Sequence, residues 1–218
     1  HAAGSIYRNS KIGDCKYSDA CVFSFHPVKI ITTGEGGSIL TNSKKIYKLV
    51  SNLRSHGINR KIKIKKNPWH YDQENLGYNY RMNDIEATLG ISQLLKLKKF
   101  VAERNKISDL YKRMLNKKKI KFQKLIKQTK SSMHLFIIRV NAKIRNKIYM
   151  NLKKKGISTN LHYIPIYRHS FYKRFNFKKK EFPNSEKYYQ EAISLPLFFG
   201  LTKKKQLKII EIINKNLK

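Results

Sequence analysis

Residues 24–37 read Ser-Phe-His-Pro-Val-Lys-Ile-Ile-Thr-Thr-Gly-Glu-Gly-Gly, and this stretch decides how the chain is interpreted. It follows an apolar run at 20–25 that predicts a short buried strand, and it holds Lys29 beside a proline that marks a bend. A lysine that attacks an aldehyde must lose its proton near neutral pH, and an apolar setting favours the neutral amine. The residues alone also allow Lys29 to be an exposed lysine in a turn, and that alternative stays open.

Regular patterns continue on both sides of this loop. Residues 37–41 predict a second strand, joined to the first through a glycine-rich connection. Residues 58–77 are weakly periodic and are expected to be a loop. Strands are expected at 133–140 and 157–163, and helices at 43–57, 83–115, 144–154, 188–193 and 207–217. Ser43 can cap the first of these helices.

The order of these elements predicts an α/β fold with a small α+β unit at the C-terminal end. We expect a first domain over residues 1–104 and a second over 105–218. Because thirty helical residues are many for a small domain, the helix at about 83–115 is expected to bridge the two domains.

The composition suggests a second class of function. The formal net charge is +35, which favours a polyanionic partner such as nucleic acid. Basic runs at 61–66 and 117–121, with Trp69 and Tyr71 nearby for base stacking, support that alternative. However, the 38 lysines far outnumber the 10 arginines, and nucleic-acid readers favour the guanidinium fork. An AT-rich genome also produces abundant Lys, Ile and Asn. Binding of nucleic acid is therefore kept as the alternative hypothesis for the function.

Cysteine and histidine usage points away from disulfides and metals. Cys15 and Cys21 have neither partner cysteines nor histidines at zinc spacing, so we expect two small buried residues and no metal site. No run approaches the roughly 18 apolar residues that span a bilayer, and no signal segment opens the chain, so a cytoplasmic protein is expected.

Several separate segments, in the same order, resemble the DegT/StrS family of pyridoxal-phosphate sugar aminotransferases. The segment at 13–29, with Phe-Ser-Phe and then Lys29, resembles the strand and lysine loop of that family. Arg-Ser-His-Gly at 54–57 is similar to a turn that follows the lysine loop in members of that family. Gly-Tyr-Asn-Tyr-Arg-Met at 77–82 is similar to the segment that opens a helix in them. Residues 161–167 and 195–198 resemble C-terminal substrate and packing segments.

The resemblance implies roles for four cofactor residues. Lys29 would be the catalytic residue, which bonds to pyridoxal 5'-phosphate and then shuttles a proton as general acid and base. Ser24 would bind the cofactor phosphate. His1 matches a position three residues after the aspartate that contacts the pyridine nitrogen. Asn79 would reach the cofactor phosphate of a neighbouring subunit, which implies a homodimer with a shared active site.

Three further residues are implied as substrate contacts, namely Arg81, His162 and Tyr163. The residues themselves leave simpler roles open. Asn79 can cap a helix, Arg81 can pair with Glu86, and His162 can be a hydrogen-bonded histidine within a strand.

The implied activity is transamination of a UDP-linked 4-keto-6-deoxy sugar with glutamate as amino donor, in the synthesis of cell-surface sugars of the pseudaminic acid type. Members that use this fold for sugar dehydration carry histidine in place of the lysine, so Lys29 favours transamination. Family chains are far longer, and their first half supplies the aspartate and most phosphate donors. We therefore expect the C-terminal part of a fold-type I aminotransferase, with an incomplete large α/β domain and impaired activity alone. A remnant that folds only with a partner chain is a third possibility.

Overall fold

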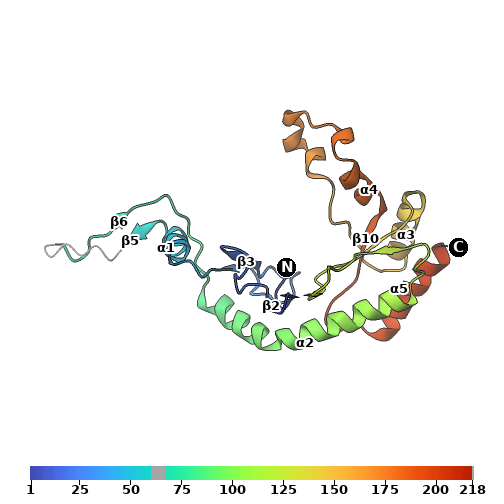
Figure 1. Cartoon of the computed structure of the whole chain (residues 1–218), viewed down its shortest axis with the longest axis horizontal. Coiled ribbons are helices and arrows are strands. Elements are labelled where there is room, and N and C mark those ends of the chain that lie inside the picture. Colours follow the sequence, from blue (N-terminus) through green and yellow to red (C-terminus); the bar gives the residue numbers. More distant parts are fainter. Residues whose placement is uncertain (60–66, 218) are drawn as a thin grey trace. The chain divides into compact units, whose positions relative to one another are not determined.

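The computed structural model describes residues 1–59 and 67–217 of a mixed α/β chain (Figure 1). Its α-helices are α1 (Lys44–Leu53), α2 (Asp84–Met114), α3 (Ala142–Lys154), α4 (Pro183–Glu191) and α5 (Lys203–Asn216). Its strands are β1 (Ile6–Tyr7), β2 (Ser10–Lys11), β3 (Cys21–Ser24), β4 (Gly37–Leu40), β5 (Ile58–Asn59), β6 (Asp72–Gln73), β7 (Lys121–Phe122), β8 (Thr129–Lys130), β9 (Phe136–Arg139) and β10 (Ala192–Leu195). Short 3-10 helices lie at η1 (Ile166–Arg168), η2 (Ser170–Phe175) and η3 (Lys179–Glu181).

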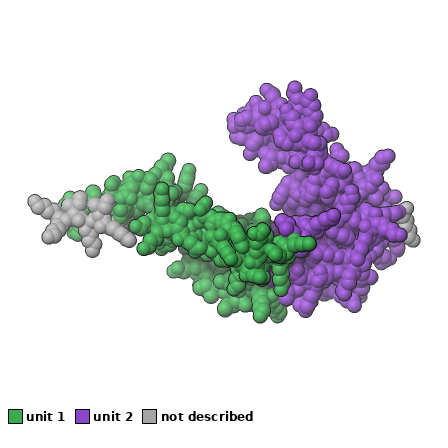
Figure 2. Space-filling model, in the orientation of Figure 1, with its two compact units in different colours: residues 1–99, 127–132 green, residues 100–126, 133–218 purple. Residues whose placement is uncertain are grey.

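The chain divides into two compact units, coloured separately in Figure 2. Unit 1 holds residues 1–99 together with 127–132, and unit 2 holds 100–126 and 133–218. The helix α2 contributes its first 16 residues (84–99) to unit 1 and the rest to unit 2. The division therefore lies within α2, five residues before the boundary at 104 that the sequence suggested.

Unit 1 consists of small antiparallel pairs beside two helices. Strands β3 and β4 form a hairpin in which Ser24 lies opposite Gly37, and β1 pairs with both β2 and β8. The Ser43 side chain accepts a hydrogen bond from the Ile46 amide and so caps α1, as the sequence predicted.

The start of α2 is closed by a reciprocal cap. The Glu86 amide donates to Oδ1 of Asn83 (2.8 Å), and the Asn83 amide donates to Oε2 of Glu86 (3.1 Å). Asn83, rather than Asn79, is therefore the capping residue. Glu86 is occupied by this cap, and no ion pair joins it to Arg81 within the described part of the chain.

Unit 2 is built around the antiparallel sheet β10-β9-β7, with α3 packed against α5. Its core combines the C-terminal half of α2 with the sheet and these two helices. Residues of this core with essentially no exposed surface include Tyr111, Ile138, Ile148, Leu152 and Ile213. Apolar periodicity correctly predicted α3 and α5, because each helix buries a stripe of isoleucine and leucine.

Two predictions in unit 2 were wrong. Residues 157–163 are not a strand; only Asn160 pairs with Ser194, in an isolated antiparallel bridge. The helix predicted at 188–193 instead ends at Glu191, and β10 begins at Ala192. All four residues of β10 are buried, and a short fully buried strand has no alternation to distinguish it from a helix.

The loop expected at 58–77 contains β5 and β6, which pair with each other, while the basic run 61–66 lies outside the described residues. Cys15 and Cys21 are free thiols, but both are half-buried and not fully buried as expected. Within residues 1–59 and 67–217, no helix is both long and apolar enough to cross a membrane. The same residues contain no cluster of three metal-binding side chains.

Candidate active site

The loop that carries Lys29 connects β3 to β4 and is fixed by backbone hydrogen bonds. The Phe25 amide donates to the Gly36 carbonyl (2.9 Å), and the Phe25 carbonyl accepts from the Thr33 amide (3.0 Å). The Lys29 amide donates to the His26 carbonyl (2.9 Å), which closes a turn at the proline. Lys29 therefore sits on a defined turn, whose ends are tied together across the hairpin.

The far side of this loop is anchored in unit 1. Ile30, Ile31 and Thr33 are buried, and the Thr33 hydroxyl donates to the Glu35 carbonyl. The loop rests on α2 at Gly90, where an added Cβ would lie 2.8 Å from Cγ2 of Thr33. The glycine thus permits a close approach between the helix and the lysine loop.

Lys29 itself is half-buried, although Val28 before it is largely exposed. The amino group of His1 has a lowered pKa, foremost because burial disfavours its charge and next because the Lys29 ammonium is within electrostatic reach. Cys21 has the opposite effect on that pKa. The structure therefore brings Lys29, His1 and the start of β3 together in unit 1.

Ser24 is the last residue of β3 and lies beside the same turn. Its Oγ accepts a hydrogen bond from the His26 amide (3.4 Å). A Cβ at Gly37, opposite Ser24 in the hairpin, would lie 2.5 Å from the Phe23 carbonyl oxygen. Only glycine lets the two backbones approach so closely, and this packing holds Ser24 at the loop end of the hairpin, next to the lysine turn.

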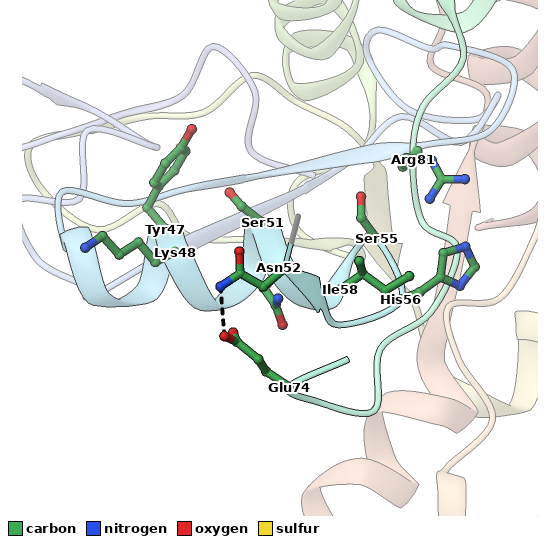
Figure 3. A pocket seen from close by; sticks show the side chains of 10 residues that line it. Tyr47, Lys48, Ser51, Asn52, Ser55, His56, Ile58, Glu74 and Arg81 are labelled. Carbon is green, nitrogen blue, oxygen red and sulfur yellow. Dashed lines mark hydrogen bonds between the residues drawn. The ribbon is translucent and has the colours of Figure 1, made fainter. Parts of the chain in front are cut away.

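Asn79 and Arg81 lie on an extended segment that runs from the hairpin β5–β6 to α2. Asn79 is exposed and forms an isolated bridge with Ser55, and the neighbouring Tyr78 and Tyr80 amides donate to carbonyls at the end of α1. Arg81 is also exposed and lines a groove in unit 1 together with His56 (Figure 3). Within residues 1–59 and 67–217, no hydrogen bond or ion pair joins Asn79 or Arg81 to Lys29.

His162 and Tyr163 lie in unit 2, in the segment after α3. Nδ1 of His162 lies 2.7 Å from the Ser194 hydroxyl on β10, so this ring has a hydrogen-bond partner. The Tyr163 ring packs edge-on against His162 and is 70% exposed. His162 is therefore hydrogen-bonded, as its simpler role required, although residues 157–163 do not form the expected strand. Tyr163 presents its ring to solvent.

Unit 2 also contains a polar cluster that the sequence analysis missed. Glu186 is buried and accepts hydrogen bonds from the Tyr167 hydroxyl and from two nitrogens of Arg168. Burial alone would raise the pKa of Glu186, but these hydrogen bonds outweigh it and lower the pKa. The sequence offered one sign of this cluster, namely that acidic residues are scarce in this chain. Among so many lysines, a carboxylate seldom lacks a specific basic partner.

Comparisons with known proteins assign these features to a family. The model of the DegT/DnrJ/EryC1/StrS aminotransferase family matches residues 1–214. A UDP-4-amino-4,6-dideoxy-N-acetyl-beta-L-altrosamine transaminase of Campylobacter jejuni is 37% identical over 205 residues, which cover 90% of this chain and 51% of that protein.

Two solved structures resemble this chain across its whole length. PseC of Helicobacter pylori, an aminotransferase involved in the biosynthesis of pseudoaminic acid, gives a TM-score of 0.89 at 32% identity, covering 100% of this chain and 57% of that one. The PLP-form of Spr1654 from Streptococcus pneumoniae, assigned as a sugar aminotransferase, gives 0.88 at 31% identity, covering 100% and 56%. The chain thus spans about half the length of the proteins it matches.

Proposed function

The chain belongs to the DegT/DnrJ/EryC1/StrS aminotransferase family, and from that premise we propose that it serves the transfer of an amino group to a nucleotide-linked sugar, with Lys29 as the catalytic residue. The observation that carries the proposal is the position of Lys29, half-buried on a turn whose backbone is fixed on both sides. A lysine held in this way returns to the same place after each reaction, which a free surface lysine does not.

The residues of this turn fit pyridoxal phosphate. The cofactor offers an aldehyde and a phosphate, which call for an amine and for hydrogen-bond donors a short distance apart. Lys29 supplies the amine, and the Ser24 hydroxyl lies at the end of the adjoining strand. When bound, the cofactor supplies an electron sink for the carbon that loses or gains a proton.

The chemistry of Lys29, Ser24 and Thr33 gives each of these residues a role in the proposed reaction. Nζ of Lys29 would hold the cofactor. Once released, it would act as general base and then general acid, taking a proton from the cofactor side and returning it to C4 of the sugar. The Ser24 hydroxyl orients the phosphate. The contacts between Thr33 and α2 keep the turn from shifting during these steps.

We further propose a UDP-linked 4-keto-6-deoxy sugar as acceptor and glutamate as donor, in the cytoplasm, where nucleotide-linked sugars are made. The name of the Campylobacter jejuni relative supports the sugar class. A homodimer is proposed because the segment that holds Asn79 and the first turn of α2 expose apolar side chains, Leu76 by 84% and Ile85 by 83%, of the kind that an interface covers. Light scattering on the purified chain measures its subunit number directly.

The test of the function is chemical. The chain is incubated with pyridoxal phosphate and reduced with borohydride, and the modified peptide is mapped. We expect the adduct to be enriched at Lys29 over the other 37 lysines, and to disappear from that peptide in Lys29→Arg. Lys45→Arg, at an exposed helix position, is the matched control and should leave the Lys29 adduct unchanged. An adduct spread evenly over the lysines would refute the assignment.

A further inference from the structure

A groove in unit 1 collects polar groups that the lysine chemistry does not use. It is lined by α1, by residues 55–59, and by Glu74 and Arg81 (Figure 3). Lys48, Ser51 and Asn52 are three and four residues apart on α1, so they share one face of that helix. The helix therefore presents an ammonium, a hydroxyl and an amide along one wall of the groove.

His56 is held in the groove by its backbone. Its φ is +64°, in the left-handed region that few residues other than glycine adopt. Its amide donates to the Tyr78 carbonyl (2.9 Å), and its carbonyl accepts from Nε2 of Gln73 (3.0 Å). A strained conformation that the surroundings hold in this way is common at functional sites, and it fixes where the ring lies.

The basic groups of the groove have no partner. Within the described residues, the charged or titratable groups of Lys48, His56 and Arg81 make no hydrogen bond or ion pair. Glu74 is the acidic residue of the lining, and its Oε1 already accepts from Nδ2 of Asn59 (2.8 Å). Apart from His56, the lining therefore carries two positive charges, on Lys48 and Arg81, and one negative charge, on Glu74. The basic donors remain available to an anion.

The two ends of the groove differ in chemistry. Arg81 and His56 lie at one end, whereas Tyr47 and Lys48 lie at the other (Figure 3). A guanidinium beside an imidazole suits a phosphate, because the guanidinium fork binds two phosphate oxygens at once. The Tyr47 ring is 66% exposed and offers a face on which a base can stack.

We propose that this groove binds the nucleoside diphosphate part of the nucleotide-linked sugar. This assignment rests on the proposed function and deepens it, since it names the part of the substrate that the groove recognises. Arg81 and His56 hold the diphosphate, and Ser51 and Asn52 face the ribose hydroxyls. Tyr47 supports the base, and Lys48 beside it donates a hydrogen bond to an oxygen of the base. The groove gives specificity for a nucleotide, while the Lys29 turn performs the chemistry.

The test uses the full chain and UDP as the probe, with uridine and inorganic pyrophosphate as its two parts. Binding is measured by calorimetry. We expect UDP to bind more tightly than either part. Arg81→Ala and Lys48→Ala should each weaken UDP by about tenfold, because each removes a charged hydrogen bond. His56→Asn, which tolerates the left-handed conformation, should weaken UDP as well.

The matched control is Lys45→Ala, an exposed lysine on the same helix that does not line the groove, and it should bind UDP as the unchanged chain does. If Lys45→Ala weakens UDP as much as Lys48→Ala, the binding is non-specific attraction to the +35 chain, and the assignment falls. Unaltered UDP affinity in Arg81→Ala and Lys48→Ala refutes it equally.

The Lys29 adduct, mapped on the same samples, separates this proposal from the function. Loss of UDP binding in Arg81→Ala with an intact Lys29 adduct supports the groove. UDP binding that depends on Arg81 without any Lys29 adduct keeps the groove and overturns the transaminase assignment. A Lys29 adduct together with UDP binding that ignores Arg81 overturns the groove alone.

Discussion

The substitution Gly90→Ala tests whether the lysine loop depends on α2. A Cβ at this position would lie 2.8 Å from Cγ2 of Thr33, about 0.6 Å inside ordinary van der Waals contact, which begins at 3.4 Å. Alanine inside a helix gains about 1 kcal/mol over glycine, whereas overpacking a filled site costs about 1–3 kcal/mol. Thr33 is 4% exposed and hydrogen-bonded, so it has little room to move. We therefore expect a net loss of roughly 1 kcal/mol in the free energy of unfolding.

The double mutant with Thr33→Ser sharpens this test. Serine keeps the hydroxyl that donates to the Glu35 carbonyl but lacks the methyl group that clashes. In the serine background, Gly90→Ala should stabilise the chain by about 1 kcal/mol, so the two backgrounds should differ by about 2 kcal/mol. Urea unfolding followed by circular dichroism measures all four variants. If Gly90→Ala raises stability equally in both backgrounds, the loop does not rest on the helix and the reasoning fails.

The remaining predictions concern unit 2. Nη1 of Arg104 donates to the carbonyls of Met133, His134 and Leu197 at 3.0–3.2 Å, and two N–H groups shared by three acceptors correspond to about two charged hydrogen bonds. Arg104→Met should therefore lower the free energy of unfolding by about 3 kcal/mol in urea, while the exposed Arg113→Met on the same helix should change it by under about 0.5 kcal/mol; equal effects would contradict this. The lowered pKa of Glu186 predicts stability that is present above the unfolded pKa of a glutamate and is lost as the pH falls through the folded pKa. Glu186→Gln should flatten the acid limb of thermal unfolding curves below about pH 5, where an ordinary glutamate begins to take up a proton, and an unchanged limb would show that the cluster is not coupled to folding.

Local patterns predicted much of unit 1 and the helices of unit 2. The Ser43 cap, the β3–β4 hairpin and the Lys29 turn each depend on residues close in sequence, so they were visible before the structure. The first two residues of β10 were assigned to a helix, because the four residues of this strand are all buried and carry no alternation. The pairing of β1 with β8 joins residues about 120 positions apart, which no window of local sequence reveals.

The candidate site divides in the same way. Lys29 and Ser24 could be inferred because the bend and the strand end lie within one short segment. The groove could not, since its lining comes from α1, β5, Glu74 and Arg81, and since His56 owes its position to a left-handed backbone. The motif at 54–57 indicates a turn, but the sequence alone does not show that His56 in this motif faces Arg81 (Figure 3).

The pairing of β1 with β8 has a consequence for synthesis on the ribosome. Tyr7 lies opposite Thr129, so the sheet around the first residues cannot close until the chain has been translated past residue 130. The lysine hairpin and α1 can form earlier, because their contacts are local. A fragment of residues 1–99 would leave an open strand edge at Ile6–Tyr7, and we expect that fragment to aggregate.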